Sequence, residues 1–370
     1  MIRSSLESKI YILPGICLRD QIPVTGPARV RWLIALAILL ILAWMAYRVW
    51  GLSFDWRRFI ITFQQLDWRW VGIAICFILF GNLPRAWRWE VMLRPTGASV
   101  GIWKLISDTA IGFAAVMLFG RVGEVVRPYL IASDAELPFS SQAAAWMLER
   151  MLDLLAVLLM FGFALIRIPS QFTAVNPQIQ RGLEAGGFVF AIFAFVCLGV
   201  LVAFRNFPAL AQVRILSGLK FLRPEAYRRV EDVLKKFSEG LECTRSSKLL
   251  AALLAYTAML WAVIIGDFYA LLHSFPATAQ FGIGDVVILL GFMSFGALLQ
   301  IPGIGGGIQV ASIVAFTGIY RVRLEAASGA AILLWAVPSM VIVTFGLACA
   351  FQKGLNWSKL KLLSTKQIIQ

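Results

Sequence analysis

Apolar residues occur along this chain in long runs separated by short polar stretches. An α-helix rises about 1.5 Å per residue, so about 20 apolar residues cross the hydrocarbon core of a bilayer, which is about 30 Å thick. Continuous apolar runs occur at residues 32–49, 70–83, 143–166, 187–204, 249–272 and 326–351. The helix that contains residues 70–83 can begin a little before residue 70. The pattern therefore predicts about six membrane-spanning helices.

Two further apolar regions are interrupted by glycine. Residues 104–132 are broken from Gly120 to Arg127, and residues 286–319 are broken from Ile301 to Gly307. Irregular backbone at membrane depth is tolerated only where protein or a water-filled cavity satisfies its polar groups. Each region therefore predicts two shorter helices joined at a glycine-containing tip.

The distribution of basic residues predicts which loops face the cytoplasm. The collar at residues 85–94 is rich in Arg and Trp, and the linker at residues 205–248 has ten Lys or Arg against five Asp or Glu. Cytoplasmic loops carry an excess of Lys and Arg, so both segments belong on the same side. Three apolar regions separate them, and three crossings would place them on opposite sides. We therefore expect residues 104–132 to enter the membrane and return to the cytoplasmic face.

The same reasoning applies to the second half. The loop at residues 275–285 has no Lys or Arg, whereas the end of the chain at residues 352–370 is rich in Lys, so residues 286–319 should form a hairpin entered from outside. The predicted fold is an all-α membrane bundle of about six spans with two re-entrant helical hairpins entering from opposite faces. Paired broken helices of this kind are typical of transporters built from inverted repeats.

Composition supports a multi-pass membrane protein. Of 370 residues, 60% are hydrophobic and 15% are charged, and the formal net charge is +14. In this setting the positive excess indicates cytoplasmic loops and anionic lipid and not a nucleic-acid partner. Five scattered cysteines and a single histidine predict neither a disulfide framework nor a metal site, and no cofactor is expected.

The domain organisation follows from these patterns. We expect a basic cytoplasmic leader at residues 1–31, one transmembrane domain at residues 32–351 and a basic cytoplasmic tail at residues 352–370. The linker at residues 205–248 is predicted to be an amphipathic helix on the cytoplasmic surface. Both termini would then face the cytoplasm, and the protein would lie in the plasma (inner) membrane.

Full charges inside the apolar runs are the candidate functional residues, because a charge at membrane depth is costly unless it is paired or hydrated. Glu149 and Asp153 are four residues apart, and Arg150 precedes Asp153 by three, so the side chains are neighbours on a helix. One interpretation is a self-neutralising cluster that pins the first hairpin. The other is an arginine that binds a lipid phosphate while the carboxylates balance its charge in the empty site.

Three further positions leave alternatives open. Glu124 and Arg127 follow the first glycine break, where helix N-termini favour anions, and they either pair locally or line a cavity. Arg85, Arg88 and Trp89 either bind headgroups or anchor the chain at the interface. Asp267, inside an apolar run, is either a member of a proton relay or the partner of an arginine.

Four motifs occur in a recognisable order, from Arg85-x-x-Arg88-Trp89 through Gly120-x-x-Gly123-Glu124-x-x-Arg127 and Glu149-Arg150-x-x-Asp153 to Pro302-Gly303-x-Gly305. This order resembles the lysylphosphatidylglycerol synthase transmembrane-region family of flippase-like proteins. Members resemble the part of the multiple-peptide-resistance factor that moves aminoacylated phosphatidylglycerol between leaflets, and others are linked to hopanoid or isoprenoid-linked lipids. We expect a stand-alone member without the aminoacyl-transfer domain.

The chain departs from the family pattern at two positions. Phe119 stands where a proline is usual before the first glycine motif, and Gln309 stands where an acidic residue is usual after the second. If these positions govern substrate choice or energy coupling, this chain differs from its relatives in both. With no nucleotide-binding loop in the sequence, coupling to an ion gradient, or no coupling, is expected.

The resulting hypothesis is a lipid flippase for a phospholipid or a polyprenyl-phosphate-type lipid, with no catalytic residue and no metal. Headgroup binding is assigned to Arg127, Arg150, Arg85, Arg88 and Trp89. Charge balance or proton relay is assigned to Glu124, Glu149, Asp153 and Asp267. The hairpin tips are assigned to Gly120, Gly123, Pro302, Gly303, Gly305 and Gln309. The alternatives are a membrane enzyme that modifies a lipid-linked substrate and a scaffold of an envelope-lipid synthesis complex.

Overall fold

The computed structural model describes residues 54–354, apart from 172–176, 219–226, 229, 232–233, 236–245, 297–299 and 302–304. The leader, the predicted first span at residues 32–49, most of the tail and much of the linker helix lie outside the described residues. The elements are α2 (Trp56–Gln64), α3 (Trp68–Phe80), α4 (Asn82–Leu93), η1 (Arg94–Thr96), α5 (Ile102–Phe119), η2 (Gly120–Val125), α6 (Val126–Asp134), α7 (Phe139–Gln171), α8 (Pro177–Asn206), α9 (Pro208–Gly218), α12 (Ser247–His273), α13 (Ile283–Gly296), β1 (Gln300–Ile301), β2 (Gly305–Gly306), α14 (Gly307–Gly318) and α15 (Leu324–Gln352).

The prediction of an all-helical membrane bundle is confirmed, with one antiparallel pair of two-residue strands, β1 and β2, as the exception within the described chain. Four described helical segments are long and apolar enough to cross a membrane: Trp68–Thr96, Ile102–Phe119, Ser247–His273 and Leu324–Gln352. Helices α7 and α8 are longer still, at 33 and 30 residues. One of the four segments is α5, which the sequence predicts only as a limb of a hairpin.

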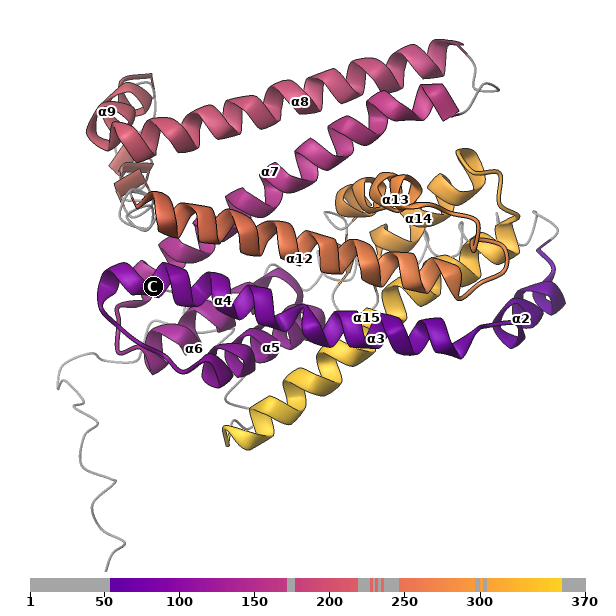
Figure 1. The fold of residues 1–370 in the computed structure, drawn as a ribbon, viewed down its shortest axis with the longest axis horizontal. Helices are drawn as coiled ribbons and strands as arrows, with labels where there is room; N and C mark the ends of the chain where they lie inside the picture. Colours follow the sequence, from indigo (N-terminus) through magenta and orange to yellow (C-terminus); the bar gives the residue numbers. More distant parts are fainter. Residues whose placement is uncertain are drawn as a thin grey trace, which may run out of the picture. The chain divides into compact units, whose positions relative to one another are not determined.

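Helix α12 runs antiparallel to α3 and α4 along their whole length (Figure 1). At one end, the backbone N–H of Asp67 donates to the carbonyl of Ser274 at 2.9 Å. At the other, Arg88 Nη1 donates to Thr257 Oγ1 at 3.4 Å. Between them Gly266 lies against the ring of Phe77, where a Cβ atom would come within 2.9 Å of the ring carbons. The absence of a side chain at Gly266 therefore lets the two helices approach closely.

Helices α5 and α6 form a hairpin joined by the 3₁₀ segment η2. Gly120 has a φ of +67°, a left-handed conformation that favours glycine and ends α5 at the tip. A Cβ on Gly112 would overlap the Arg127 side chain, and a Cβ on Gly123 would overlap the Ala115 backbone. Helix α6 is nine residues long, about 14 Å, too short to cross a bilayer.

One lysine joins the two feet of this first hairpin. Lys353, just after α15, pairs with Asp108 near the start of α5 and with Asp134 at the end of α6, the second contact being 3.0 Å. Burial lowers the pKa of the Lys353 ammonium, but the hydrogen bonds and charges of the two carboxylates outweigh burial and raise the pKa above its ordinary value. The contribution of the Lys353 charge to stability is therefore present at neutral pH and is lost as the pH rises through the raised pKa of Lys353.

Helices α13 and α14 form the second hairpin. Near its tip, Gly296 packs so closely on Gly307 that a Cβ would overlap the backbone, and Gly306 has a φ of +97°. Gln309 accepts a hydrogen bond from the Gly306 N–H through Oε1 at 2.6 Å, so the amide that replaces the usual acid still caps the helix. At the feet, Tyr320 Oη donates to the Asp285 carbonyl at 3.4 Å.

Helix α15 holds both hairpins. Its C-terminal half runs antiparallel to α5, with Ser339 Oγ 3.7 Å from Met117 Sδ and Gly346 against the Ala110 backbone. Its N-terminal half packs its apolar residues into one core with α13 and α14. The feet of the first hairpin lie at the Lys353 end of α15, and those of the second lie beside Leu324, where α15 begins. Pro338 lies between the two halves.

The close contact of α15 with α5 makes a specific prediction. Gly346→Val places methyl groups where the Ala110 carbonyl and the Ala114 side chain now lie. Overpacking of this kind costs about 1–3 kcal/mol, so the unfolding temperature measured by circular dichroism in detergent should fall. Gly72→Val is the matched control because nothing lies within 4 Å of a Cβ there. Equal unfolding temperatures in the two variants would contradict the described helix contact.

Candidate functional site

The charges of α4 and α7 meet in a buried ion network. The Arg88 side chain is 1% exposed and the Glu149 side chain 0% exposed, and they pair directly. Arg88 Nη1 also contacts Asp153 Oδ1 at 2.6 Å. Because Glu149 and Asp153 are one helical turn apart on α7, both carboxylates face α4 and one guanidinium bridges them. A buried guanidinium is tolerated only when it is paired in this way.

Glu149 also binds residues of two other helices. Arg127, from α6 in the first hairpin, pairs with Glu149 Oε2, and the indole N–H of Trp89 donates to the same oxygen at 3.0 Å. The Arg127 guanidinium lies 5.0 Å from the Trp89 ring and 5.2 Å from the Phe113 ring, distances suited to cation–π attraction. A single buried carboxylate thus joins α4, α6 and α7, as the interpretation of a cluster that pins the first hairpin requires.

Arg150 lies at the edge of this network. Its Nη2 atom is 3.1 Å from Asp153 Oδ2 and 3.6 Å from Glu149 Oε1, which confirms the contact expected from the spacing on the helix. The Arg150 side chain is 41% exposed, unlike those of Arg88 and Arg127. Three guanidinium groups share two carboxylates, so the network retains one excess positive charge on the side where Arg150 is exposed.

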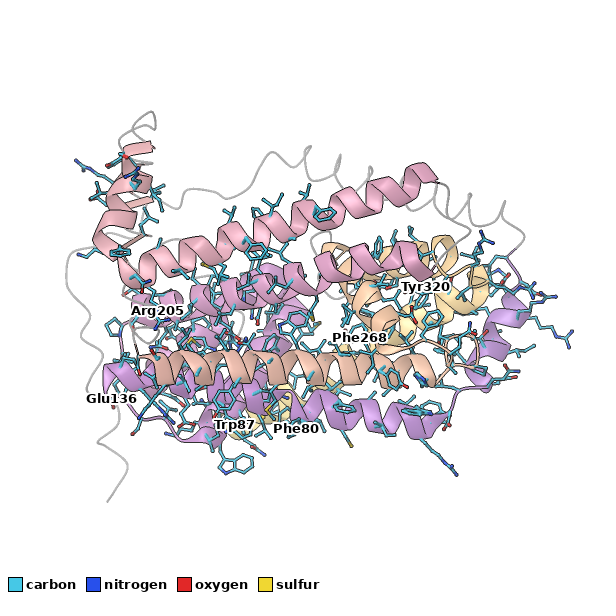
Figure 2. All side chains as sticks on the ribbon, turned by 45° about the horizontal axis from the view of Figure 1, so that its top comes forward. Phe80, Trp87, Glu136, Arg205, Phe268 and Tyr320 are labelled. Carbon is cyan, nitrogen blue, oxygen red and sulfur yellow. The ribbon has the colours of Figure 1, made fainter. Side chains whose placement is uncertain are left out.

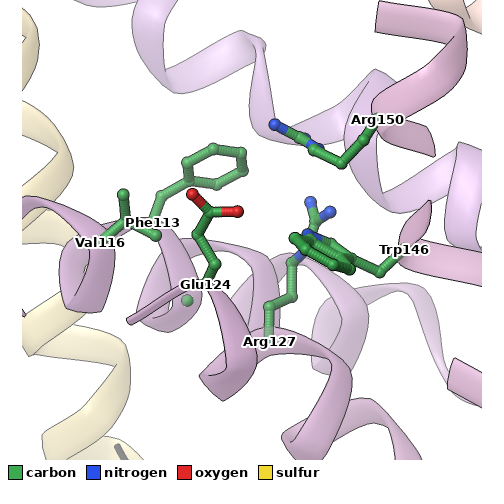
Figure 3. A pocket seen from close by; sticks show the side chains of 7 residues that line it. Phe113, Val116, Glu124, Arg127, Trp146 and Arg150 are labelled. Carbon is green, nitrogen blue, oxygen red and sulfur yellow. The ribbon is translucent and has the colours of Figure 1, made fainter. Parts of the chain in front are cut away.

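A cavity of about 70 Å³ opens beside this excess charge. Figure 3 shows the Glu124 carboxylate next to the Phe113 ring, with Arg127, Arg150 and Trp146 on the other side of the space. The Nη1 atom of Arg127 is buried and has no hydrogen-bond partner. Glu124 forms no ion pair with any residue in the described ranges, so the predicted local pair with Arg127 is absent and the cavity-lining interpretation matches the structure.

The structure places other predicted residues as follows. Arg88 and Trp89 lie in the interior instead of at a lipid interface. Arg88 pairs there with Glu149 and Asp153, and the Trp89 indole N–H donates to Glu149. Arg85 donates to the Gly81 carbonyl at 2.9 Å, and its guanidinium lies 4.7 Å from the Phe113 ring. Asp267 is buried in a second cavity that it shares with Arg85.

At the second hairpin the predicted tip residues are only partly described. Pro302 and Gly303 lie outside the described residues, whereas Gly305 lies in β2. The second hairpin brings no ionised side chain to a cavity described here, and the charged groups all belong to α4–α7 and α12. His273 rests against Tyr269 and Trp70 at the end of α12 and binds the Tyr269 carbonyl at 2.9 Å.

Sequence reasoning missed several site residues. Phe113, Gly112 and Trp146 line the cavity but lie inside ordinary apolar runs, and nothing in their spacing marks them. The Lys353 contact with Asp108 was also missed. Here a signal existed, because Asp108 is a charged residue within the apolar run that begins at Lys104, and buried charges require partners.

The network makes Glu149 the most sensitive position for stability. Glu149→Gln removes the negative charge from between Arg88 and Arg127, both of which are buried. Breaking one partner of a buried ion pair costs about 3–5 kcal/mol, so the variant should unfold at a much lower temperature in detergent or fail to accumulate. Glu90→Gln, which removes an exposed pair with Arg94, is the control and should unfold like the parent protein. Similar losses in both variants would contradict the network.

Comparison with known proteins agrees with the fold and with the motif order. No curated protein and no solved structure matched the chain. The profile of the family described as Lysylphosphatidylglycerol synthase TM region matches residues 32–346, which includes all four charged or glycine-rich motifs. The chain is a multi-pass membrane protein, and it belongs to the Lysylphosphatidylglycerol synthase TM region family.

Proposed function

We propose that this protein moves a lipid with an anionic, phosphate-bearing headgroup between the two leaflets, with the headgroup passing through the cavity beside Arg127 and Arg150. The observation that carries the proposal is the excess positive charge of the network, exposed at a cavity where a buried donor of Arg127 has no partner. Membership of a lipid-handling membrane family supports it. The substrate is a phospholipid or a polyprenyl-phosphate-type lipid.

The cavity suits a phosphate better than a neutral group. Guanidinium groups donate two parallel hydrogen bonds to phosphate oxygens, and such charged bonds are about twice as strong as neutral ones. Glu149 and Asp153 hold Arg127 and Arg150 in position without covering them fully. Glu124 balances the charge of the empty cavity, and its repulsion of the phosphate promotes release. The lipid tails remain in the bilayer, so only the headgroup has to be accommodated.

The proposed topology has both hairpins entering the membrane and returning, from opposite faces. Support comes from the feet, which lie at opposite ends of α15, and from the length of α6, too short to cross. We further propose that the first hairpin, the N-terminus and the C-terminus lie on the cytoplasmic side of the plasma (inner) membrane, as the excess of Lys and Arg in the neighbouring segments favours. Transport energised by an ion gradient, or running down the lipid gradient, fits this arrangement.

The proposal is tested by translocation in reconstituted vesicles. Purified protein is reconstituted into sealed phosphatidylcholine vesicles that carry fluorescent phosphatidylglycerol in the inner leaflet. The fraction of the fluorescence that an external quencher can reach is then measured over time. The parent protein should accelerate translocation over protein-free vesicles. Arg127→Gln should lower the rate by about tenfold or more, because a hydrogen bond to a charged group contributes about 1.5–3 kcal/mol.

Glu124→Gln should bind the labelled lipid more tightly and release it more slowly, since the repelling carboxylate is gone. Arg94→Gln and Glu90→Gln, which alter an exposed pair away from the cavity, are the matched controls and should behave like the parent protein. Unchanged rates in both cavity variants would refute the assigned roles. Chemical change of the labelled lipid, found by mass spectrometry of the same vesicles, would favour the membrane enzyme instead.

A further inference from the structure

A second polar cavity shares one lining residue, Phe113 of α5, with the first. It has a volume of about 180 Å³ and is enclosed by α3, α4, α5, α12 and α15. Its polar side chains are Asn82, Arg85 and Asp267, set among apolar ones. Asp267 is 6% exposed, and its Oδ1 atom has no hydrogen-bond partner. An ionisable group buried at this depth without a bonded partner marks a functional site by default.

One aromatic side chain stands at both cavities. Phe113 lines both of them. The Arg127 guanidinium of the first cavity lies 5.2 Å from the ring centre, and the Arg85 guanidinium of the second lies 4.7 Å from it. Both arginines are therefore held against the same side chain, and a change of the Phe113 rotamer would join the two spaces.

The two cavities have the same chemistry. Each holds a guanidinium and a carboxylate that share the cavity without forming an ion pair, namely Arg127 with Glu124 in the first and Arg85 with Asp267 in the second. Within the described chain, Arg85 hydrogen-bonds only the Gly81 carbonyl. Arg127 is also paired with Glu149, whereas Arg85 has no bonded counter-ion among the described residues, and such a guanidinium in a low-dielectric interior is an anion-binding group.

The second cavity also extends along the helices away from the feet of the first hairpin. Gly266, next to Asp267, packs on Phe77, which precedes Arg85 by eight residues, about 12 Å of helix. The α3 end of this helix pair is tied to the far end of α12 through Asp67 and Ser274. A group that leaves Arg127 for Arg85 has therefore entered a space lined as far as Phe77 on α3 and Phe268 on α12.

We infer that Arg85 and Asp267 form a second binding site for the lipid phosphate and that Phe113 is the gate between this site and the first. The inference rests on the proposed function and deepens it. The phosphate is held first by Arg127 and Arg150, and it passes to Arg85 when the Phe113 ring turns aside. Asp267 lies beside the phosphate at the second site, where its Oδ1 atom has no hydrogen-bond partner among the described residues.

The gate is tested in the vesicle assay with fluorescent phosphatidylglycerol. Phe113→Ala should raise the translocation rate several-fold, because the barrier between the cavities is removed, and Phe113→Trp should lower it. Phe80→Ala, which truncates an exposed phenylalanine on α3 (Figure 2), is the control and should match the parent protein. A Phe113→Trp protein as fast as the parent, or a Phe113→Ala protein that folds but is not faster, would overturn the gate.

The second site is tested by comparing translocation with equilibrium binding of radiolabelled phosphatidylglycerol in detergent. Arg85→Gln should lower translocation about tenfold, as expected for the loss of a charged hydrogen bond, while binding at the first site changes little. Arg94→Gln is the control for the substitution itself. If Arg85→Gln weakens binding as strongly as Arg127→Gln does, there is one site and the inference is wrong.

Binding also separates the two proposals if the parent protein moves no lipid. In that case the proposed function is wrong, but the binding measurements still show whether the protein has one phosphate site or two. Arg127→Gln should keep a weaker residual binding of phosphatidylglycerol that the Arg127→Gln/Arg85→Gln double variant loses. Equal residual binding in the single and double variants would overturn the second site. Unfolding temperatures of all variants, measured in the same detergent, identify any that have lost the fold.

Discussion

The burial of Glu149 between two arginines is the constraint on which this structure depends. Its two oxygens receive Arg88 from α4, Arg127 from α6 and the Trp89 indole, so residues of three helices meet at one carboxylate. Pairing makes each of these charges tolerable at membrane depth, and none could be buried alone. The same pairing leaves one guanidinium more than Glu149 and Asp153 can neutralise, and Glu124 lines the cavity beside them without pairing with any residue of the described ranges. Stability and a place for an anion thus arise from a single arrangement.

Close packing at glycine positions the network. Arg127 can approach Glu149 only because α6 lies directly against α5, and Gly112 has no side chain to prevent this. In a membrane, helices associate by van der Waals contact at small residues and by polar contacts between helices, since lipid is as apolar as leucine. Gly112, Gly123 and Gly346 provide the close van der Waals contacts, and the paired charges provide the polar contacts between helices. The first hairpin is consequently held on both faces, by α7 on one and by α15 on the other.

Much of the fold was predictable because its signals are local. Run length and glycine breaks predicted the helices of both hairpins, and spacing on α7 predicted the contact between Arg150 and Asp153. Partner choice across helices was not predictable. The sequence places Arg88 in a basic collar and Arg127 beside Glu124, yet both reach Glu149, because the pairing is decided by which helices pack together and not by separation along the chain. Phe113 carries no signal at all, since an aromatic residue in an apolar run is indistinguishable from its neighbours.

Helix α15 has a proline in its middle, and each half holds a different hairpin. Pro338 cannot donate the backbone hydrogen bond that would continue the helix, and kinks in long helices concentrate at such positions. It also lines the cavity that contains Asp267. A flexion at Pro338 would tilt one hairpin relative to the other while it deforms the wall of that cavity. Pro338 is therefore placed to act as a hinge between the two halves of the bundle, and this hinge lies in the wall of the cavity that contains Asp267.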